Sequence, residues 1–306
     1  MSRAHELLPI PDRSLPEEPM PGLELTDRHR SELEIGERFV PGPAGEPDVR
    51  VVVYRPRALE GRLPILLHIH GGAFCILHPE SFAGMEANWA LGHGCVVVSV
   101  DYRLAPEHPF PAAPDDCYAA LQWVGKNADD LGIDLNRLVV TGGSAGGALT
   151  AALAMMVRDR GGPKIAYQAL LIPVTDDRMT TPSMAQAGAE TPGFNSVGAV
   201  GMWLHYLGED YDRSSTSPYA APARAENFAD LPPAFIQTNG LDPLRDEGIE
   251  YGLKLLAAGI PVELYNCPGA YHGAPPLDSR TAGLSFQIYN AALGAALNPD
   301  EPTSGL

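Results

Sequence analysis

A six-residue stretch at positions 142–147, Gly-Gly-Ser-Ala-Gly-Gly, constrains the fold of this chain more than any other feature. It directly follows an apolar run at 137–141 and opens a helical pattern at 145–160. A serine held by small residues between a strand and a helix is typical of a nucleophile elbow, where the turn exposes the hydroxyl and the helix N-terminus supplies N–H groups. Glycine and serine also build ordinary turns, so a turn without chemistry is the alternative. The pattern predicts a strand–turn–helix unit with Ser144 as candidate nucleophile.

Most of the remaining chain alternates between apolar runs and helical patterns. Segments 34–40 and 49–55, joined by a Pro/Gly turn, predict an antiparallel pair of strands. Near-continuous apolar strands that alternate with helices are typical of a parallel sheet covered on both faces, so we expect an α/β fold with an eight-stranded, mostly parallel sheet flanked by helices. The further strands are expected at 63–69, 95–100, 137–141, 165–172, 233–238 and 260–265, and the helices near 81–92, 112–127, 145–160, 246–258 and 279–296.

Two segments depart from this alternation. Residues 1–33 contain five prolines, which exclude a long helix, although a short one fits 23–33. About 60 residues separate the strand that ends near 173 from the strand that starts near 233, far more than a plain crossover needs. The domain organisation that we predict is an N-terminal cap segment at 1–33, a catalytic α/β domain at 34–173 and 231–297, and a helical cap insertion at 174–230. Such an insertion stands over an active site at the carboxyl ends of the strands.

Composition limits the partners and the location. The formal net charge of −17 argues against nucleic acid and anionic membrane surfaces as partners. The sequence has no apolar stretch long enough for a membrane span, and its first residues lack the apolar core of a signal peptide. Cys75, Cys95, Cys117 and Cys267 have no CxxC spacing and suggest buried free thiols. We therefore expect a cytoplasmic protein with no membrane or nucleic-acid partner.

A serine nucleophile needs a base, and chain order narrows the choice. In α/β-hydrolases the order is serine, acid, histidine, and only His205 and His272 follow Ser144. His205 falls in the helix expected within the insertion. His272 lies in a loop of small residues just after the last strand, at the sheet edge where a base belongs. His272 is the preferred base, and a surface histidine without a catalytic role is the alternative.

The orienting acid should follow the strand at 233–238. Asp242 lies at the exit of that strand, within reach of the histidine loop, whereas Asp246 and Glu247 fall in the helix that follows. Asp242 precedes a proline, so it could instead serve only as the N-cap of that helix. Asp242 is the preferred acid, with Asp246 and Glu247 as runners-up.

The third expected part is an oxyanion hole. His70, Gly71 and Gly72 follow the strand at 63–69, and glycines there let backbone N–H groups turn into a cavity without a Cβ clash. The N–H groups of Gly71, Gly72 and Ala145 are the predicted donors. His68 and His70 also form an H-x-H pair that could hold a metal, but the sequence offers no third ligand at suitable spacing, so we expect no metal and take His70 as a brace for the loop.

Together these motifs resemble the hormone-sensitive lipase family of bacterial esterases, within the α/β-hydrolase fold. The resemblance spans roughly residues 34–297. Two positions depart from the family pattern, because Gly143 replaces the usual Asp or Thr of the elbow and Ala73 replaces the third glycine of the oxyanion loop. The motifs that carry the resemblance are His70-Gly71-Gly72, Asp101 to Glu107, Gly142 to Gly147, Asp242-Pro243-Leu244 and Tyr271-His272-Gly273.

The resemblance implies a serine carboxylesterase with the triad Ser144, Asp242 and His272. It implies that the substrate is a small-molecule ester of short or medium acyl chain and that no cofactor is needed. It also implies a structural role for the Asp101 to Glu107 stretch and a homodimer that pairs through residues 260–297. The same triad would also serve an arylformamidase-like, lactone or carbamate hydrolase. A non-catalytic ligand-binding relative is disfavoured because such relatives lose the histidine. The candidate substrate-binding residues are Phe74, Phe194, Met202, Trp203 and Tyr206.

Overall fold

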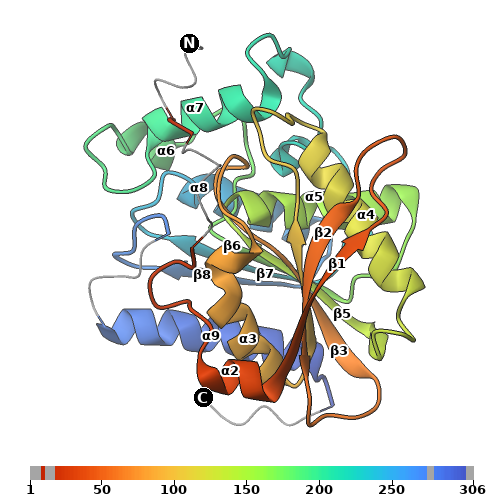
Figure 1. The fold of residues 1–306 in the computed structure, drawn as a ribbon. Coiled ribbons are helices and arrows are strands. Elements are labelled where there is room, and N and C mark those ends of the chain that lie inside the picture. Colours follow the sequence, from red (N-terminus) through yellow and green to blue (C-terminus); the bar gives the residue numbers. More distant parts are fainter. Residues whose placement is uncertain (1–7, 11–17, 274–278, 301–306) are drawn as a thin grey trace.

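The computed structural model describes residues 8–10, 18–273 and 279–300 and contains one eight-stranded sheet (Figure 1). The strand order is β1-β2-β4-β3-β5-β6-β7-β8, in which β1 and β2 pair antiparallel, β2 is antiparallel to β4, and all other pairs are parallel. All eight predicted strands are confirmed. They are β1 Leu33–Val40, β2 Val49–Pro56, β3 Leu63–Ile69, β4 Val96–Asp101, β5 Ile133–Gly143, β6 Tyr167–Leu171, β7 Ala234–Asn239 and β8 Val262–Cys267.

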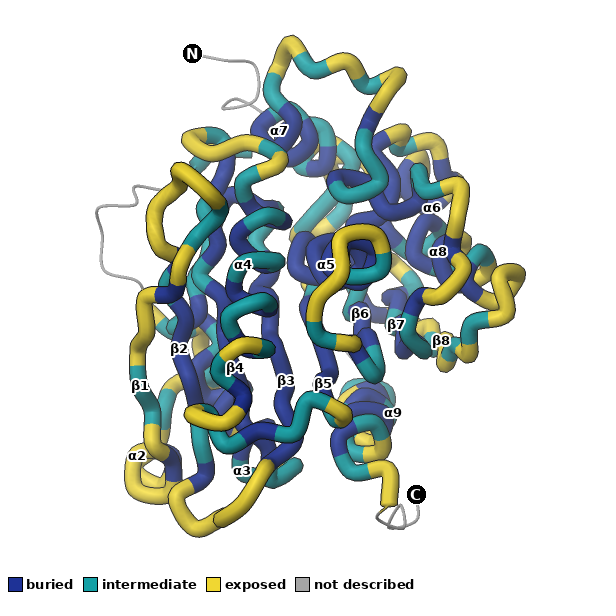
Figure 2. The backbone as a smooth tube through the Cα atoms, turned by 90° about the vertical axis from the view of Figure 1, so that its right-hand side faces the viewer, coloured by how far each residue is buried: buried dark blue, intermediate teal, exposed yellow. Residues whose placement is uncertain are grey.

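Helices cover both faces of the sheet, which explains the near-continuous apolar runs in its central strands. Side chains alternate along β3. Leu66 joins the core beneath α3 (Ala83–His93) and α9 (Ser279–Leu297), while Ile65 and Leu67 join the core beneath α4 (Ala112–Lys126) and α5 (Ala145–Arg160). Figure 2 shows these central strands buried along most of their length. The predicted helices are confirmed as α3 Ala83–His93, α4 Ala112–Lys126, α5 Ala145–Arg160, α8 Arg245–Ala257 and α9 Ser279–Leu297, with a short α2 at Asp27–Glu32.

The segment between β6 and β7 contains α6 (Pro182–Gln186), α7 (Ser196–Leu207) and two short 3₁₀ turns. Figure 1 shows α6 and α7 at the end of the molecule opposite α2. A buried ion pair anchors the segment, because the Arg224 guanidinium donates to the fully buried Asp177 carboxylate and Thr216 donates to the same group. The Tyr206 ring of α7 stacks on Phe74, which follows β3, with centroids 3.7 Å apart. Packing thus places α7 over the carboxyl end of the sheet.

Part of the N-terminal segment packs against the same region. The Leu8 carbonyl accepts a hydrogen bond from His205 Nε2 of α7 at 2.9 Å, and the Met20 N–H donates to the Ser81 carbonyl. Residues 1–7 and 11–17 of the predicted cap segment lie outside the described residues.

Two expectations from composition can be compared with the described part of the chain. None of its helices combines the length and apolarity that crossing a bilayer requires. All four cysteines are buried and free, as their spacing predicted.

Candidate active site

The turn between β5 and α5 presents Ser144 in a strained conformation. Its φ of 55° and ψ of −117° are rarely adopted by a residue with a side chain, and such strain is typical of functional turns. The turn closes only because glycines flank it. A Cβ on Gly142 would lie 2.3 Å from the Gly146 carbonyl oxygen, and a Cβ on Gly146 would lie 2.0 Å from the Ile69 carbonyl oxygen. The glycines therefore let the hydroxyl stand at the carboxyl edge of the sheet.

The structure brings together the three side chains that the sequence selected. His272, after β8, has its Nε2 2.9 Å from Ser144 Oγ and its Nδ1 2.7 Å from Asp242 Oδ2. Asp242 follows β7 and is almost completely buried, while the His272 side chain is 10% exposed. Neighbouring parallel strands β5, β6, β7 and β8 end at one edge, which is why residues 128 positions apart meet there.

The partners of each imidazole nitrogen define its protonation in the resting site. A carboxylate only accepts hydrogen bonds, so the proton of a neutral His272 ring sits on Nδ1 and is donated to Asp242. Nε2 is then free to accept the Ser144 hydroxyl proton. Asp242 Oδ1 also accepts the Leu244 N–H at 2.8 Å, so this residue both caps the turn before α8 and orients the histidine.

The runner-up residues lie elsewhere. Asp246 accepts hydrogen bonds from the Ser183 N–H and from Arg245, and Glu247 Oε1 accepts the Thr175 and Asp176 N–H groups. Burial raises the pKa of Glu247 well above its usual value, which favours its neutral form. His205 donates through Nε2 to the Leu8 carbonyl and is buried in α7, outside the hydrogen-bonded group of Ser144, His272 and Asp242.

The loop after β3 passes directly beside the elbow. A Cβ on Gly71 would lie 2.9 Å from the Gly143 carbonyl oxygen and 3.6 Å from Ser144 Cβ. Gly72 has a φ of +109°, and a Cβ there would lie 2.0 Å from the Ile76 carbonyl oxygen. Ala145 is the first residue of α5, so its N–H has no acceptor within the helix. The three predicted oxyanion donors thus belong to backbone that borders the serine.

His70 braces this loop, as the sequence indicated. Its Nδ1 lies 2.7 Å from the Gly71 carbonyl oxygen, and the Tyr102 ring stacks on it with centroids 4.2 Å apart. The Tyr102 hydroxyl donates to the His70 carbonyl at 3.0 Å. Burial lowers the pKa of His70 to about 4, so the ring is neutral at pH 7 and Nδ1 is the donor.

The lowered pKa of His70 predicts a pH-dependent stability. Below pH 6.5 the unfolded chain binds a proton that the folded His70 does not bind until about pH 4, so stability falls as the pH drops through this window. We expect the free energy of unfolding of the wild type, measured by urea denaturation, to fall by about 3 kcal/mol more than that of His70→Gln between pH 7 and pH 4. Parallel pH dependences for the two proteins would contradict the assignment.

A mostly apolar cavity of about 360 Å³ opens beside the serine. Ser144, His272, Gly71 and Gly72 line it, together with Phe194, whose ring lies 4.9 Å from the His272 ring. Gly143 also lines it, and a Cβ there would meet only Leu171 at 3.9 Å, so the glycine leaves room that a larger elbow residue would fill. The remaining apolar lining comes from Leu8, Met20, Ala73, Ile76, Leu77, Phe82, Met85, Trp89, Leu171, Ile172 and Tyr289.

Only Phe194 of the five predicted substrate-binding residues lines this cavity, and the prediction is corrected for the other four. Met202, Trp203 and Tyr206 face inward from α7 and are buried, and Phe74 is buried against them. The sequence could not separate the inward from the outward face of this helix, because its apolar residues are spread around much of it.

Several residues around the site gave no recognisable signal in the sequence. Asn239, at the end of β7, donates through Nδ2 to the Tyr271 carbonyl at 2.7 Å and so holds the loop that carries His272. The Leu241 N–H donates to the Ala270 carbonyl and ties the acid and histidine loops together. Trp89 and Tyr289, from α3 and α9, resembled ordinary helix-packing residues in the sequence.

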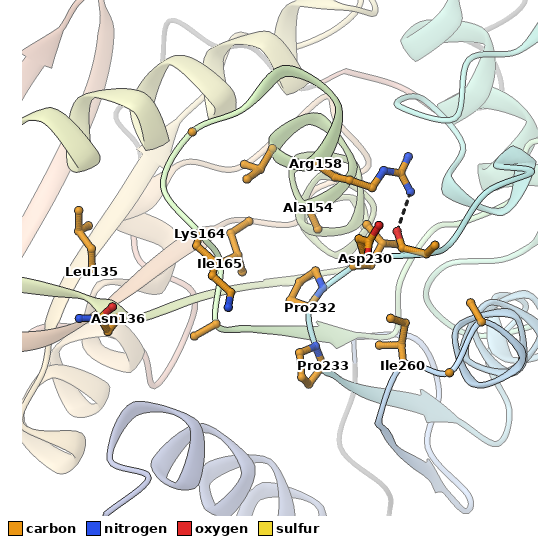
Figure 3. Close-up of a pocket in the computed structure, with 17 residues that line it drawn as sticks. Leu135, Asn136, Ala154, Arg158, Lys164, Ile165, Asp230, Pro232, Pro233 and Ile260 are labelled. Atoms are coloured by element: carbon orange, nitrogen blue, oxygen red, sulfur yellow. Dashed lines mark hydrogen bonds between the residues drawn. The ribbon is translucent and has the colours of Figure 1, made fainter.

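A larger cavity, of about 1010 Å³, lies away from these residues (Figure 3). Pro233 and Ile260, which line it, precede β7 and β8, so it sits at the amino edge of the sheet. Arg158 in its wall donates to the Ala229 carbonyl and pairs with Asp159. The candidate nucleophile and base, Ser144 and His272, line the smaller cavity and not this one.

The two histidines of the H-x-H pair hydrogen-bond to different partners through Nδ1. His68 Nδ1 bonds the buried Glu86 carboxylate at 2.5 Å, and His70 bonds the Gly71 carbonyl. No cluster of three or more potential metal ligands occurs among the described residues. Arg103, in the Asp101 to Glu107 stretch, donates to the buried Asp116 through its guanidinium, which matches the structural role that we expected for it.

Comparison with known proteins identifies the family. A family model described as alpha/beta hydrolase fold matches residues 66–275. The chain belongs to this family. It is the hormone-sensitive-lipase-like family that the motifs indicated. The chain is also 41% identical to Esterase LipI of Mycobacterium tuberculosis, over 85% of its own length and 78% of that protein, and 42% identical to Carboxylesterase NlhH of the same organism, over 79% and 76%.

Solved structures agree with this assignment. The structure named Bacterial Heroin Esterase is 38% identical to this chain and superposes with a TM-score of 0.86. The match covers 93% of this chain and 95% of that protein's chain. Like these relatives, this member of the hormone-sensitive-lipase-like family is a carboxylic ester hydrolase.

Proposed function

We propose that this esterase hydrolyses short- to medium-chain acyl esters through a triad of Ser144, His272 and Asp242. The observation that carries the proposal is the continuous hydrogen-bonded line from Ser144 Oγ through His272 to Asp242, with separations of 2.9 and 2.7 Å. A serine hydroxyl is a poor nucleophile unless a base stands within hydrogen-bond distance and a third group orients that base. All of these conditions are met beside an apolar cavity.

In the first step Ser144 Oγ attacks the ester carbonyl carbon while His272 Nε2 takes the hydroxyl proton. Asp242 keeps the other ring proton on Nδ1 and stabilises the imidazolium that forms. The tetrahedral intermediate collapses when the carbon–oxygen bond to the alcohol breaks, and His272 gives its proton to the departing oxygen. The products of this step are the free alcohol and an acyl-serine.

The negative oxygen of the tetrahedral intermediate is held by the N–H groups of Gly71, Gly72 and Ala145. The close approach of Gly71 to the elbow supports this role, since its backbone borders Ser144. A donor of this kind is typically worth about 3 kcal/mol of transition-state stabilisation. Water then attacks the acyl-serine with His272 as base, and the acid leaves as Ser144 regains its proton.

The segments that cover the cavity act as a cap. Residues 174–230 contribute Phe194 to its wall, and the N-terminal segment contributes Leu8 and Met20. A cavity of about 360 Å³ with this lining favours acyl chains of short to medium length, because a longer chain would project beyond the buried apolar surface.

A series of p-nitrophenyl esters from acetate to laurate tests this proposal. We expect kcat/KM to peak between acetate and hexanoate and to fall for decanoate and laurate, since added methylenes gain nothing once the cavity is filled. A peak at laurate would contradict the size of the acyl site. The absence of hydrolysis of any ester by a folded protein would overturn the proposed substrate class.

We also propose a cytoplasmic homodimer that has no nucleic-acid partner. The four buried free cysteines suit a reducing compartment. The order of strands leaves β8 at one edge of the sheet, and Leu264 on β8 is an exposed apolar side chain, as are Leu253 and Leu256 of α8, the helix that packs against β8. An apolar edge strand is a ready site for pairing with a second copy.

A further inference from the structure

A second cavity, of about 390 Å³, adjoins the one beside Ser144. The two share part of their walls, so the second is a continuation of the first toward α9. It extends between the sheet and that helix, where Ser285, Phe286 and Tyr289 line it. The residues common to both cavities are Met85, Trp89, Leu171, Ile172, Gly273 and Tyr289. We call the second cavity the distal chamber.

The wall that β7 and β8 give to the distal chamber is polar. Gln237 and Asn239 alternate with Ile236 and Thr238 along β7, so they face α9 whereas the intervening residues face α8. Cys267 of β8 pairs with Asn239 in the sheet and lines the same wall. A substrate that fills the apolar cavity thus reaches hydrogen-bonding groups farther in.

Gln237 presents unused hydrogen-bond donors to this chamber. The Ser285 hydroxyl donates to Gln237 Oε1 at 3.0 Å and fixes the orientation of the amide. The Gln237 NH₂ group has no hydrogen-bond partner among the residues that the structure describes, and it belongs to a half-buried side chain. Asn239 differs, because its Nδ2 already donates one N–H to the Tyr271 carbonyl and its Oδ1 has no hydrogen-bond partner among the described residues. In this wall the Gln237 amide therefore offers the NH₂ group with no partner among the described residues.

The charge of the lining restricts what this donor can bind. The described residues that line the two cavities include no Asp, Glu, Lys or Arg. A charged substrate group would lose its hydration there without gaining an opposite charge. A neutral oxygen acceptor, such as a ketone, ester or amide carbonyl, matches the amide N–H groups and costs less to desolvate.

We propose that the distal chamber is a specificity site for esters that carry a neutral carbonyl acceptor in one half of the molecule, several bonds from the scissile ester, and that Gln237 binds this acceptor. The inference rests on the proposed function. It extends that function, because the chamber would distinguish esters of equal length by the polarity of the group farthest from the scissile bond. Gln237 touches neither the reacting atoms nor the triad, so it sets specificity without taking part in the chemistry.

Pairs of isosteric esters test the proposal in two arms. In the acyl arm, kcat/KM for p-nitrophenyl 7-oxooctanoate and 5-oxohexanoate is compared with that for octanoate and hexanoate. In the alcohol arm, the acetate of 8-hydroxyoctan-2-one is compared with octyl acetate. In one arm we expect the wild-type kcat/KM for the oxo ester to exceed that for the alkyl ester by about 5- to 10-fold. This ratio corresponds to about one hydrogen bond. No preference in either arm would overturn the proposal.

The variant Gln237→Leu removes both donors and leaves an apolar, branched side chain that is one atom shorter. We expect its oxo-to-alkyl ratio to fall to about 1 while kcat/KM for the alkyl esters is retained. The matched control is Gln287→Leu, because Gln287 is an exposed glutamine of α9 outside the chamber, and it should keep the wild-type ratio. An unchanged ratio in Gln237→Leu would overturn the role of this residue.

Two further measurements keep the outcome clear. Circular dichroism tests whether Gln237→Leu folds. If this variant does not fold, Gln237→Met takes its place, and we expect the same oxo-to-alkyl ratio of about 1. Hydrolysis of p-nitrophenyl acetate by wild type separates the two proposals, because this ester needs the triad but has no carbonyl acceptor several bonds from the scissile ester. Acetate hydrolysis with no oxo preference would contradict the chamber alone, whereas no hydrolysis at all would contradict the proposed function.

Discussion

Replacement of Ser144 by alanine is expected to lower kcat for p-nitrophenyl esters by about 10⁵-fold, with little change in KM. The substitution removes the only atom of the proposed triad that bonds to the substrate carbon, and His272 then has no hydroxyl to deprotonate. The oxyanion donors and the cavity remain, so we expect residual hydrolysis above the rate in water. The measurement is kcat and KM from steady-state kinetics, with the enzyme concentration determined from protein absorbance.

The control for this variant is another serine outside the cavity. Ser31→Ala alters an exposed hydroxyl of α2 that donates to the Arg28 carbonyl, and it should retain wild-type kcat. A Ser144→Ala enzyme that kept more than one-tenth of the wild-type kcat while folding normally would contradict the triad.

Gly72→Ala is expected to lower kcat by about 10²-fold or more. A Cβ at this position would lie 2.0 Å from the Ile76 carbonyl oxygen, and the φ of +109° disfavours any side chain, so the loop after β3 must move. Displacing one oxyanion donor typically costs 10²–10³ in kcat. We expect KM to change less than kcat, because the donors hold charge that develops only in the transition state.

The matched control is Gly92→Ala. Gly92 lies in α3, and a Cβ there would meet nothing within 4 Å, so this change should leave kcat unaltered and raise the melting temperature slightly. If Gly72→Ala had wild-type kcat, the loop after β3 would have no part in stabilising the oxyanion.

The strands and the residues of the candidate triad could be predicted because local rules determine them. Apolar runs of strand length indicate buried strands, and the small residues around Ser144 indicate a tight turn that larger residues would block. Parallel strands then bring their carboxyl ends to one edge, so chain order together with position directly after the last two strands favours His272 and Asp242. The sequence therefore predicted which side chains meet, without any knowledge of their distances.

The pocket could not be predicted in the same way. Phe74 follows the predicted oxyanion loop, and Met202, Trp203 and Tyr206 lie in the predicted cap, yet these apolar side chains are buried in the core instead of lining the cavity. The walls come instead from distant elements, such as Trp89 of α3 and Tyr289 of α9, whose side chains resemble ordinary packing residues. Which face of a helix lines a cavity depends on how that helix packs against the rest of the protein. No local sequence pattern predicts that packing.

The most direct test of the account is covalent labelling by a fluorophosphonate. Serine attack displaces fluoride from phosphorus, and the adduct can be located by mass spectrometry of the digested protein. The account predicts a single adduct on Ser144 in the wild type, slow labelling of the folded His272→Ala variant, and none of Ser144→Ala. An adduct on a different residue, or no adduct on Ser144 in the folded wild type, would contradict the proposal that Ser144 is the nucleophile.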